Sequence, residues 1–206
     1  MKTVDVPVGS VICDSLPFST GGTVAQAIAL KTSGVVALAL YLGAVTPAIL
    51  KKVLDAGLGY MPVTFGGEYE DGADDELVQL KALGIPKGCC VWLDMEGLKA
   101  FKTDPAKLIS MLTAWANKIE AAGFIPCLYV GVPQPLTSDE LWKLPFRRYW
   151  KGQGSVRDRF NNLAEPTKCG WSITQMWPSH TRGGAWVDSN IVGQDFLKRS
   201  PTMAVA

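Results

Sequence analysis

Histidine is nearly absent from this sequence, in which His180 is the only one among 206 residues. A zinc site of histidine and cysteine ligands would be hard to assemble, and metallohydrolases or phosphodiesterases that use two or more histidines are excluded. A Ser-His-Asp triad would have to use His180, but no G-x-S-x-G element accompanies it. The composition of residues 178–184 (PSHTRGG) predicts a surface loop around this histidine.

An excess of charge of either sign is also missing. Twenty basic residues stand against nineteen acidic ones, which gives a net charge of +1, and no run of five basic residues occurs. This balance argues against an electrostatic role at nucleic acids or at membrane surfaces. We therefore expect no nucleic-acid partner.

Long apolar runs are lacking as well. The longest, residues 34–45, is shorter than the roughly 20 residues that a membrane-spanning helix needs. Residues 1–7 lack the apolar core of a signal peptide. These features predict a soluble chain that is made in the cytoplasm and has no membrane partner.

The cysteines show no C-x-x-C spacing, and most of them lie in apolar, strand-like runs. An odd number in such positions predicts reduced core thiols rather than a disulfide framework. With one histidine and no C-x-x-C the sequence predicts no metal centre. No cofactor is expected either, and a G-x-G-x-x-G element after a strand is absent. The five cysteines are Cys13, Cys89, Cys90, Cys127 and Cys169.

What the sequence does contain is a regular alternation of apolar strand-like runs with helix-like segments. Such alternation is typical of a parallel α/β sheet, and eight units favour a closed (β/α)₈ TIM-type barrel as a single domain over residues 1–206. An open doubly wound sheet is the alternative, which the missing glycine-rich element disfavours. The predicted strands are residues 4–13, 35–42, 60–65, 89–95, 124–130, 146–150, 170–177 and 185–188, and the predicted helices are residues 24–32, 48–56, 75–83, 106–122, 137–144, 156–164 and 193–199.

Two carboxyl groups end the fourth predicted strand, whose sequence is CCVWLDMEG over residues 89–97. If this segment is extended throughout, Asp94 and Glu96 share a face and their Cα atoms lie about 7 Å apart. Trp92 has the same parity and would lie below Asp94 inside the barrel. Two acids at the end of a buried strand are costly unless they are solvated, paired or used in chemistry.

Polar side chains end most of the other predicted strands, where the active site of a (β/α)₈ barrel lies. Closure would bring the first and eighth strands together, with the fourth across the mouth. A cluster of acids raises at least one pKa, which suits a general acid, and without histidine the chemistry would be that of carboxylates, as in glycoside hydrolysis. Trp150 and Trp186 suit either stacking on sugars or core packing. The strand-end residues are Asp14, Tyr41, Asp94, Glu96, Tyr129, Gln175, Trp177 and Asp188.

In this layout the chain resembles the glycoside hydrolase family 25 lysozymes and the related glycoside-hydrolase-like domain of unknown function in bacteria and phages. The matching elements are an Asp after the first strand (residues 11–15, VICDS), D-x-E on the fourth (92–96, WLDME), a Tyr on the fifth (128–129), a Trp/Gln element on the seventh (174–177, TQMW) and V-D-x-N on the eighth (187–190, VDSN). Residues 41–43, 54–58 and 61–63 are similar to the unknown-function branch. Tyr41 stands where the lysozymes carry a second-strand acid, and the seventh-strand order differs from their W-Q-Y.

The resemblance implies a muramidase that cleaves the glycan strands of peptidoglycan, either as a phage endolysin or as a virion-associated protein. Glu96 would be the general acid, Asp94 would orient the substrate's N-acetyl group, and Asp14 and Asp188 would position substrate. The binding role would extend to Tyr41, Tyr129, Gln175 and Trp177. The alternatives are a non-catalytic barrel that binds glycan or serves in virion assembly, with virion or tail proteins as partners, and an enzyme acting on a phosphosugar.

Overall fold

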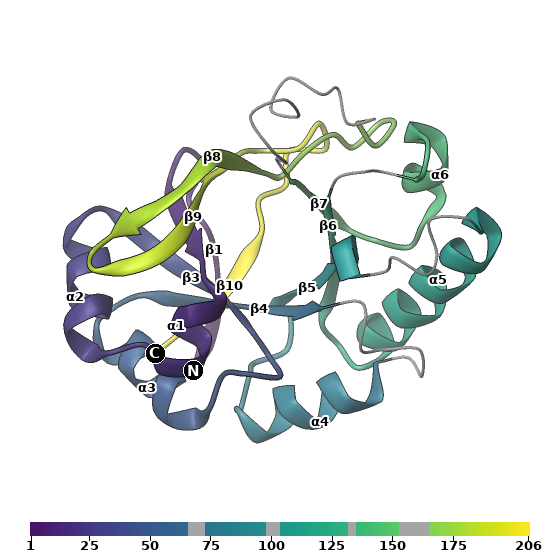
Figure 1. The fold of residues 1–206 in the computed structure, drawn as a ribbon. Helices are drawn as coiled ribbons and strands as arrows, with labels where there is room; N and C mark the ends of the chain where they lie inside the picture. Colours follow the sequence, from purple (N-terminus) through teal and green to yellow (C-terminus); the bar gives the residue numbers. More distant parts are fainter. Residues whose placement is uncertain (66–72, 98–103, 132–134, 153–164) are drawn as a thin grey trace.

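Eight strands pair edge to edge into a closed ring in the computed structural model (Figure 1), which confirms the predicted barrel. The structure describes residues 1–65, 73–97, 104–131, 135–152 and 165–206, without the side chain of Trp177. Around the ring the order is β2, β3, β4, β5, β6, β7, β8 and β9, and β9 returns to β2. These strands are β2 (Val11–Asp14), β3 (Val35–Tyr41), β4 (Gly59–Phe65), β5 (Cys90–Asp94), β6 (Ile125–Val130), β7 (Arg148–Lys151), β8 (Ile173–Arg182) and β9 (Ala185–Val192).

The last strand of the ring runs against all the others. β2 to β8 pair in parallel, but β9 is antiparallel to both β8 and β2, so the expectation of an all-parallel sheet is wrong at this strand. Only Gly183 and Gly184 join β8 to β9, and both have positive φ, 57° and 75°. A two-residue glycine turn closes a hairpin, whereas a parallel return needs a crossover of about a dozen residues. Asp188 therefore lies within β9 and not at its end.

Two further strands lie outside the ring. The predicted first strand, residues 4–13, is in fact two strands, β1 (Lys2–Asp5) and β2, separated by a turn in which Gly9 has a φ of 81°. β1 pairs with β10 (Thr202–Val205), and β10 contacts the start of β4 through Ala204 and Tyr60. These two strands cover the end of the barrel at which its parallel strands begin.

The helices lie on the outside of the ring (Figure 1), and capping residues define where most of them begin. Thr23, Thr46, Asp104 and Thr137 each accept a hydrogen bond from a backbone N–H of the first turn, as the Ser/Thr/Asp signals predict. The helices are α1 (Leu16–Gly21), α2 (Val24–Thr32), α3 (Pro47–Asp55), α4 (Asp74–Ala82), α5 (Pro105–Ala121) and α6 (Ser138–Lys143).

Three local expectations differ from the structure. Helix α1 is not among the predicted helices, and it begins where Ser15 caps it by accepting a hydrogen bond from Phe18 N. The expected helix at 193–199 is a turn, since the buried Asp195 carboxylate accepts the backbone N–H groups of Leu197 and Arg199. His180 belongs to β8 and not to a loop. The helix expected at 156–164 lies outside the described residues.

Side-chain parity divides the core into two layers. Trp92, Trp150, Met61 and Ile173 fill the inside of the barrel, as expected for Trp92, while the opposite faces of the strands pack against the helices. The indole rings of Trp92 and Trp150 meet edge to face with centroids 5.5 Å apart. All five cysteines are buried and free, which confirms the prediction of reduced thiols. In the ranges that the structure describes, no helix is both long and apolar enough to cross a membrane.

Thr202 offers a test of how β10 is attached to the barrel. Its hydroxyl accepts the Cys90 N–H at 2.9 Å and donates to the Gly88 carbonyl at 2.8 Å. Thr202→Val keeps the shape but leaves the buried N–H unpaired, so we expect the free energy of unfolding to fall by about 1–3 kcal/mol. Urea denaturation measures this, with Thr202→Ser, which keeps the hydroxyl, as the matched control. Equal losses in both variants would contradict this role of the hydroxyl.

Candidate active site

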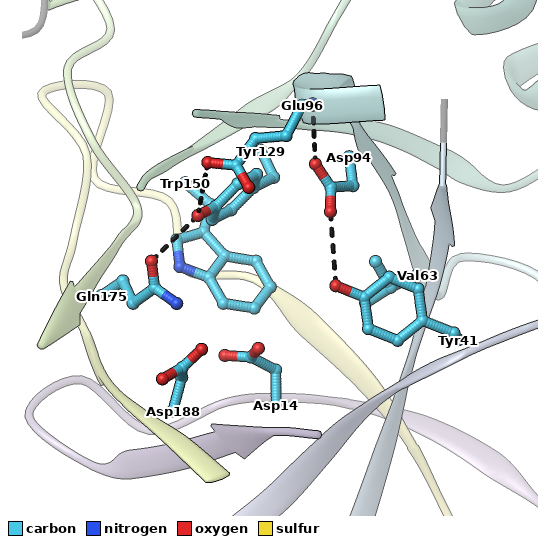
Figure 2. Close-up of a pocket in the computed structure, with 9 residues that line it drawn as sticks. All are labelled: Asp14, Tyr41, Val63, Asp94, Glu96, Tyr129, Trp150, Gln175 and Asp188. Carbon is cyan, nitrogen blue, oxygen red and sulfur yellow. Dashed lines mark hydrogen bonds between the residues drawn. The ribbon is translucent and has the colours of Figure 1, made fainter. Parts of the chain in front are cut away.

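The two acids after β5 are arranged by a turn rather than by a strand. β5 ends at Asp94, and Met95–Gly97 form a single 3-10 turn, η2, so the predicted extended D-x-E is wrong. The Asp94 carboxylate accepts the backbone N–H of Glu96, from N to Oδ1 at 2.9 Å, and a local bond of this kind competes with strand pairing. The two side chains still reach one pocket (Figure 2).

That pocket lies at the barrel mouth and has a volume of about 80 Å³. It brings together seven of the eight predicted site residues, and the side chain of the eighth, Trp177, lies outside the described residues. Two more side chains line it, Val63, which sequence reasoning missed, and Trp150, which it left between stacking and core packing. The predicted seven are Asp14, Tyr41, Asp94, Glu96, Tyr129, Gln175 and Asp188.

Asp14 and Asp188 form one wall of the pocket, opposite Asp94 and Glu96 (Figure 2). They are direct partners in the β2–β9 register, which confirms that closure places them side by side. Asn190 Nδ2 donates to Asp14 Oδ2 at 2.7 Å, and Trp150 Nε1 donates to Asn190 Oδ1 at 2.9 Å. The indole thereby fixes the orientation of the buried amide, and the amide fixes the Asp14 carboxyl. Burial, followed by the charge of Asp188, raises the pKa of Asp14 well above its ordinary value.

Asp94 is almost fully buried on the other wall. Its Oδ1 is bound to the Glu96 N–H, and its Oδ2 accepts from the Tyr41 hydroxyl at 3.3 Å. Burial raises the pKa of Asp94 to about 7, and the neighbouring Glu96 charge acts in the same direction against the two hydrogen bonds. The residue therefore changes its charge near neutral pH.

Glu96 meets the Tyr129 hydroxyl, which lies 3.5 Å from Glu96 Oε1 and 2.9 Å from Gln175 Oε1. A phenol donates only one hydrogen, and the shorter contact assigns that hydrogen to Gln175. The Tyr129 hydroxyl thus lies between the Glu96 and Gln175 side chains, with the stronger hydrogen bond to Gln175 and a longer one to Glu96.

None of the nine described residues that line the pocket is basic. In the described part of the chain, no group of three or more His, Cys, Asp or Glu side chains is arranged to hold a metal ion. His180 Nε2 does lie 3.2 Å from Ser189 Oγ, but His180 Nδ1 faces the Pro178 carbonyl and not a carboxylate. Ser189 has the opposite parity to Asp188 and Asn190, which places it on the helix-facing side of β9.

Two glycines at the ends of neighbouring strands make room for this arrangement, and sequence reasoning missed both. A Cβ atom on Gly131, after β6, would lie 2.5 Å from Glu96 Cδ, and one on Gly152, after β7, would lie 2.7 Å from the Tyr129 hydroxyl oxygen. Real Cβ atoms do not approach other atoms so closely. Gly131 directly follows the predicted strand at residues 124–130, a position that could have pointed to the site. Its contact with Glu96, however, depends on tertiary structure.

Gly131→Ala should displace the Glu96 side chain without unfolding the barrel, because the overlapping atoms belong to a flexible side chain. We expect a crystal structure of the variant to show Glu96 turned away from Tyr129, with a thermal midpoint close to that of the parent. Gly21→Ala is the matched control, since a Cβ at Gly21 meets no atom within 4 Å. An unmoved Glu96 in Gly131→Ala would contradict the steric role.

The raised pKa of Asp94 predicts a dependence of stability on pH. The unfolded chain releases this proton near pH 4 and the folded chain near pH 7, so between these values the folded state holds more protons. The Asp94 contribution to the free energy of unfolding should therefore fall as pH rises through this window and level off above it. The difference between wild type and Asp94→Asn in urea denaturation at several pH values measures it. A difference that does not change with pH would refute the shift.

Comparison with family models gives no match for this sequence, and comparison with curated protein sequences gives none either. Solved structures share the fold. An uncharacterized protein of B. stearothermophilus matches with a TM-score of 0.66 at 15% identity, over 92% of this chain and 99% of that one. The Tat-secreted protein Rv2525c of Mycobacterium tuberculosis, in complex with L-tartrate, matches with a TM-score of 0.62 at 13% identity, over 91% of this chain and 99% of that one. A bacterial lysozyme from Streptomyces coelicolor matches with a TM-score of 0.58 at 11% identity, over 91% of this chain and 93% of that one. This chain therefore shares its barrel fold with a lysozyme.

Proposed function

We propose that this protein is a lysozyme-like glycoside hydrolase that cleaves the glycan strands of bacterial peptidoglycan. The observation that carries the proposal is the convergence of Asp14, Asp94, Glu96 and Asp188 in one pocket whose described lining holds no basic side chain. Glycosidases use pairs of carboxyl groups of which one is protonated. The fold that the chain shares with the Streptomyces coelicolor lysozyme adds support.

In this mechanism Glu96 donates its proton to the glycosidic oxygen as the bond to the leaving sugar breaks. Tyr129, which is held by Gln175, orients the Glu96 carboxyl. Asp94, fixed by the Glu96 N–H and the Tyr41 hydroxyl, orients the N-acetyl group of the substrate, whose oxygen attacks the anomeric carbon. Glu96 then takes a proton from the water that opens this intermediate and so returns to its acid form.

A second candidate is a non-catalytic barrel of the same fold. It would bind glycan without cleaving it, or serve in virion assembly with virion or tail proteins as partners. A specific observation favours it: the pocket of about 80 Å³ is smaller than the roughly 300–1,000 Å³ of ordinary ligand sites. In addition, both oxygens of Asp94 already hold protein hydrogen-bond donors. An enzyme acting on a phosphosugar is not favoured, because the described pocket lining has no basic side chain to bind a phosphate.

The proposal is tested by incubating the protein with purified peptidoglycan and measuring soluble muropeptides and new reducing ends. We expect release by the wild type and a loss of about 100- to 10,000-fold in Glu96→Gln, which cannot donate a proton. Glu120→Gln is the control, since Glu120 is an exposed α5 carboxylate paired with Arg147. Absence of release by the wild type, with binding to peptidoglycan retained, would reject the hydrolase and leave the second candidate.

A further inference from the structure

One row of side chains on β9 leads from the barrel core to the solvent. Val192 packs in the barrel interior, Asn190 is fully buried, Asp188 lines the pocket and Trp186 is 57% exposed. Alternate residues of a strand share a face, so these four all have the inward parity. Because β9 runs antiparallel to β2 and Asp188 pairs with Asp14 at the end of β2, Trp186 stands about 7 Å beyond Asp188, at the rim of the mouth.

The other face of β9 confirms this orientation. Ala185 and Val187, which flank Trp186, are buried in the layer between barrel and helices. At Trp186, therefore, the outer face of β9 is covered by the helices while its inner face is exposed to solvent. Trp186 therefore lies on the uncovered face of the hairpin, on the same side of β9 as Asp188.

The backbone that carries Trp186 is fastened to the helices beside it. Ser15 Oγ donates to the Trp186 carbonyl at 2.7 Å, and Gln26 Nε2 donates to the Gly184 carbonyl at 2.8 Å. Arg182 Nε donates to Ser33 Oγ at 2.8 Å. A Cβ at Gly183 would lie 2.8 Å from Leu30 N, so the hairpin turn packs closely on α2, beside which Figure 1 shows it. A large aromatic surface on a preorganised backbone costs little entropy when a ligand covers it.

We propose that Trp186 forms a sugar-binding subsite in which a neutral pyranose stacks on the indole and directs hydroxyl donors toward Asp188. This inference rests on the proposed glycan specificity and adds a contact outside the pocket. The chemistry fits: an indole face offers an apolar platform for the C–H face of a sugar ring, while the adjacent carboxyl groups accept hydrogen bonds. An anionic group would meet the carboxyl groups of Asp188 and Asp14 with no basic side chain in the described pocket lining, and an apolar ligand would offer no donor to Asp188.

The test measures binding of a soluble tetrasaccharide of β-1,4-linked N-acetylglucosamine by isothermal titration calorimetry, with Glu96→Gln as the background to prevent turnover. Trp186→Ala should raise Kd about five- to tenfold, as expected for one aromatic stacking contact, and Trp186→Phe should change it less than about twofold. Phe196→Ala is the matched control. Phe196 is 62% exposed and lies against Gly170, before the start of β8, far from the mouth.

Equal affinity of Trp186→Ala and its parent would overturn the subsite, as would failure of the parent to bind the tetrasaccharide. Because Trp186→Phe keeps an aromatic face, normal binding by it alongside weak binding by Trp186→Ala separates stacking from misfolding. The proposed hydrolase is judged separately by release of muropeptides from wild-type protein. Tetrasaccharide binding that depends on Trp186, without such release, would keep the subsite and reject only the hydrolase.

Discussion

The pocket at the mouth of this barrel gathers carboxyl groups without a positive charge to balance them, and the rest of the site depends on this. Asp14, Asp94, Glu96 and Asp188 share a small space in which no described lining residue is basic, so ionising all four carboxyl groups together is unfavourable. Neutral groups donate hydrogen bonds to these carboxyl groups instead. An amide donates to Asp14, and a phenol and a backbone N–H donate to Asp94. Burial and mutual repulsion then keep protons on the site at pH values where exposed carboxyl groups have lost theirs.

Closure of the barrel by a hairpin completes the second wall of this site. The antiparallel β9 enters the barrel at its mouth, so Trp186, Asp188 and Asn190 follow one another along one strand from the rim toward the core. A single sequence element of period two thereby links the rim, the pocket and the core.

The sequence predicts the barrel and most of the site because both depend on short-range patterns. Apolar runs that reach Asp14, Tyr41, Asp94 and Tyr129 favour strands by their local pattern, and barrel topology gathers the strand ends. The 3-10 turn at Glu96 could not be predicted in this way, since an alternating apolar pattern continues through Met95 while one carboxylate captures a backbone N–H. The reversal of β9 did have a signal, Gly183-Gly184 between two strand-like runs.

Other features depend on tertiary contacts that no local pattern encodes. Gly131 lies 35 positions after Glu96, and only the folded structure shows that the missing side chain leaves room for the acid. Asn190 was visible within a motif, but its role in orienting Asp14 through Trp150 follows from three strands meeting inside the ring.

The pairing of β1 with β10 has a geometric consequence for how the molecule can be attached to others. Lys2 is the partner of Val205, so the first and last strands end side by side (Figure 1), and Thr202 ties them to Cys90 at the beginning of β5. Both chain ends thus emerge at the pole of the barrel opposite the acidic mouth. A tether, a surface anchor or a fused module joined at either end would leave that mouth facing outward, free to approach an extended polymer.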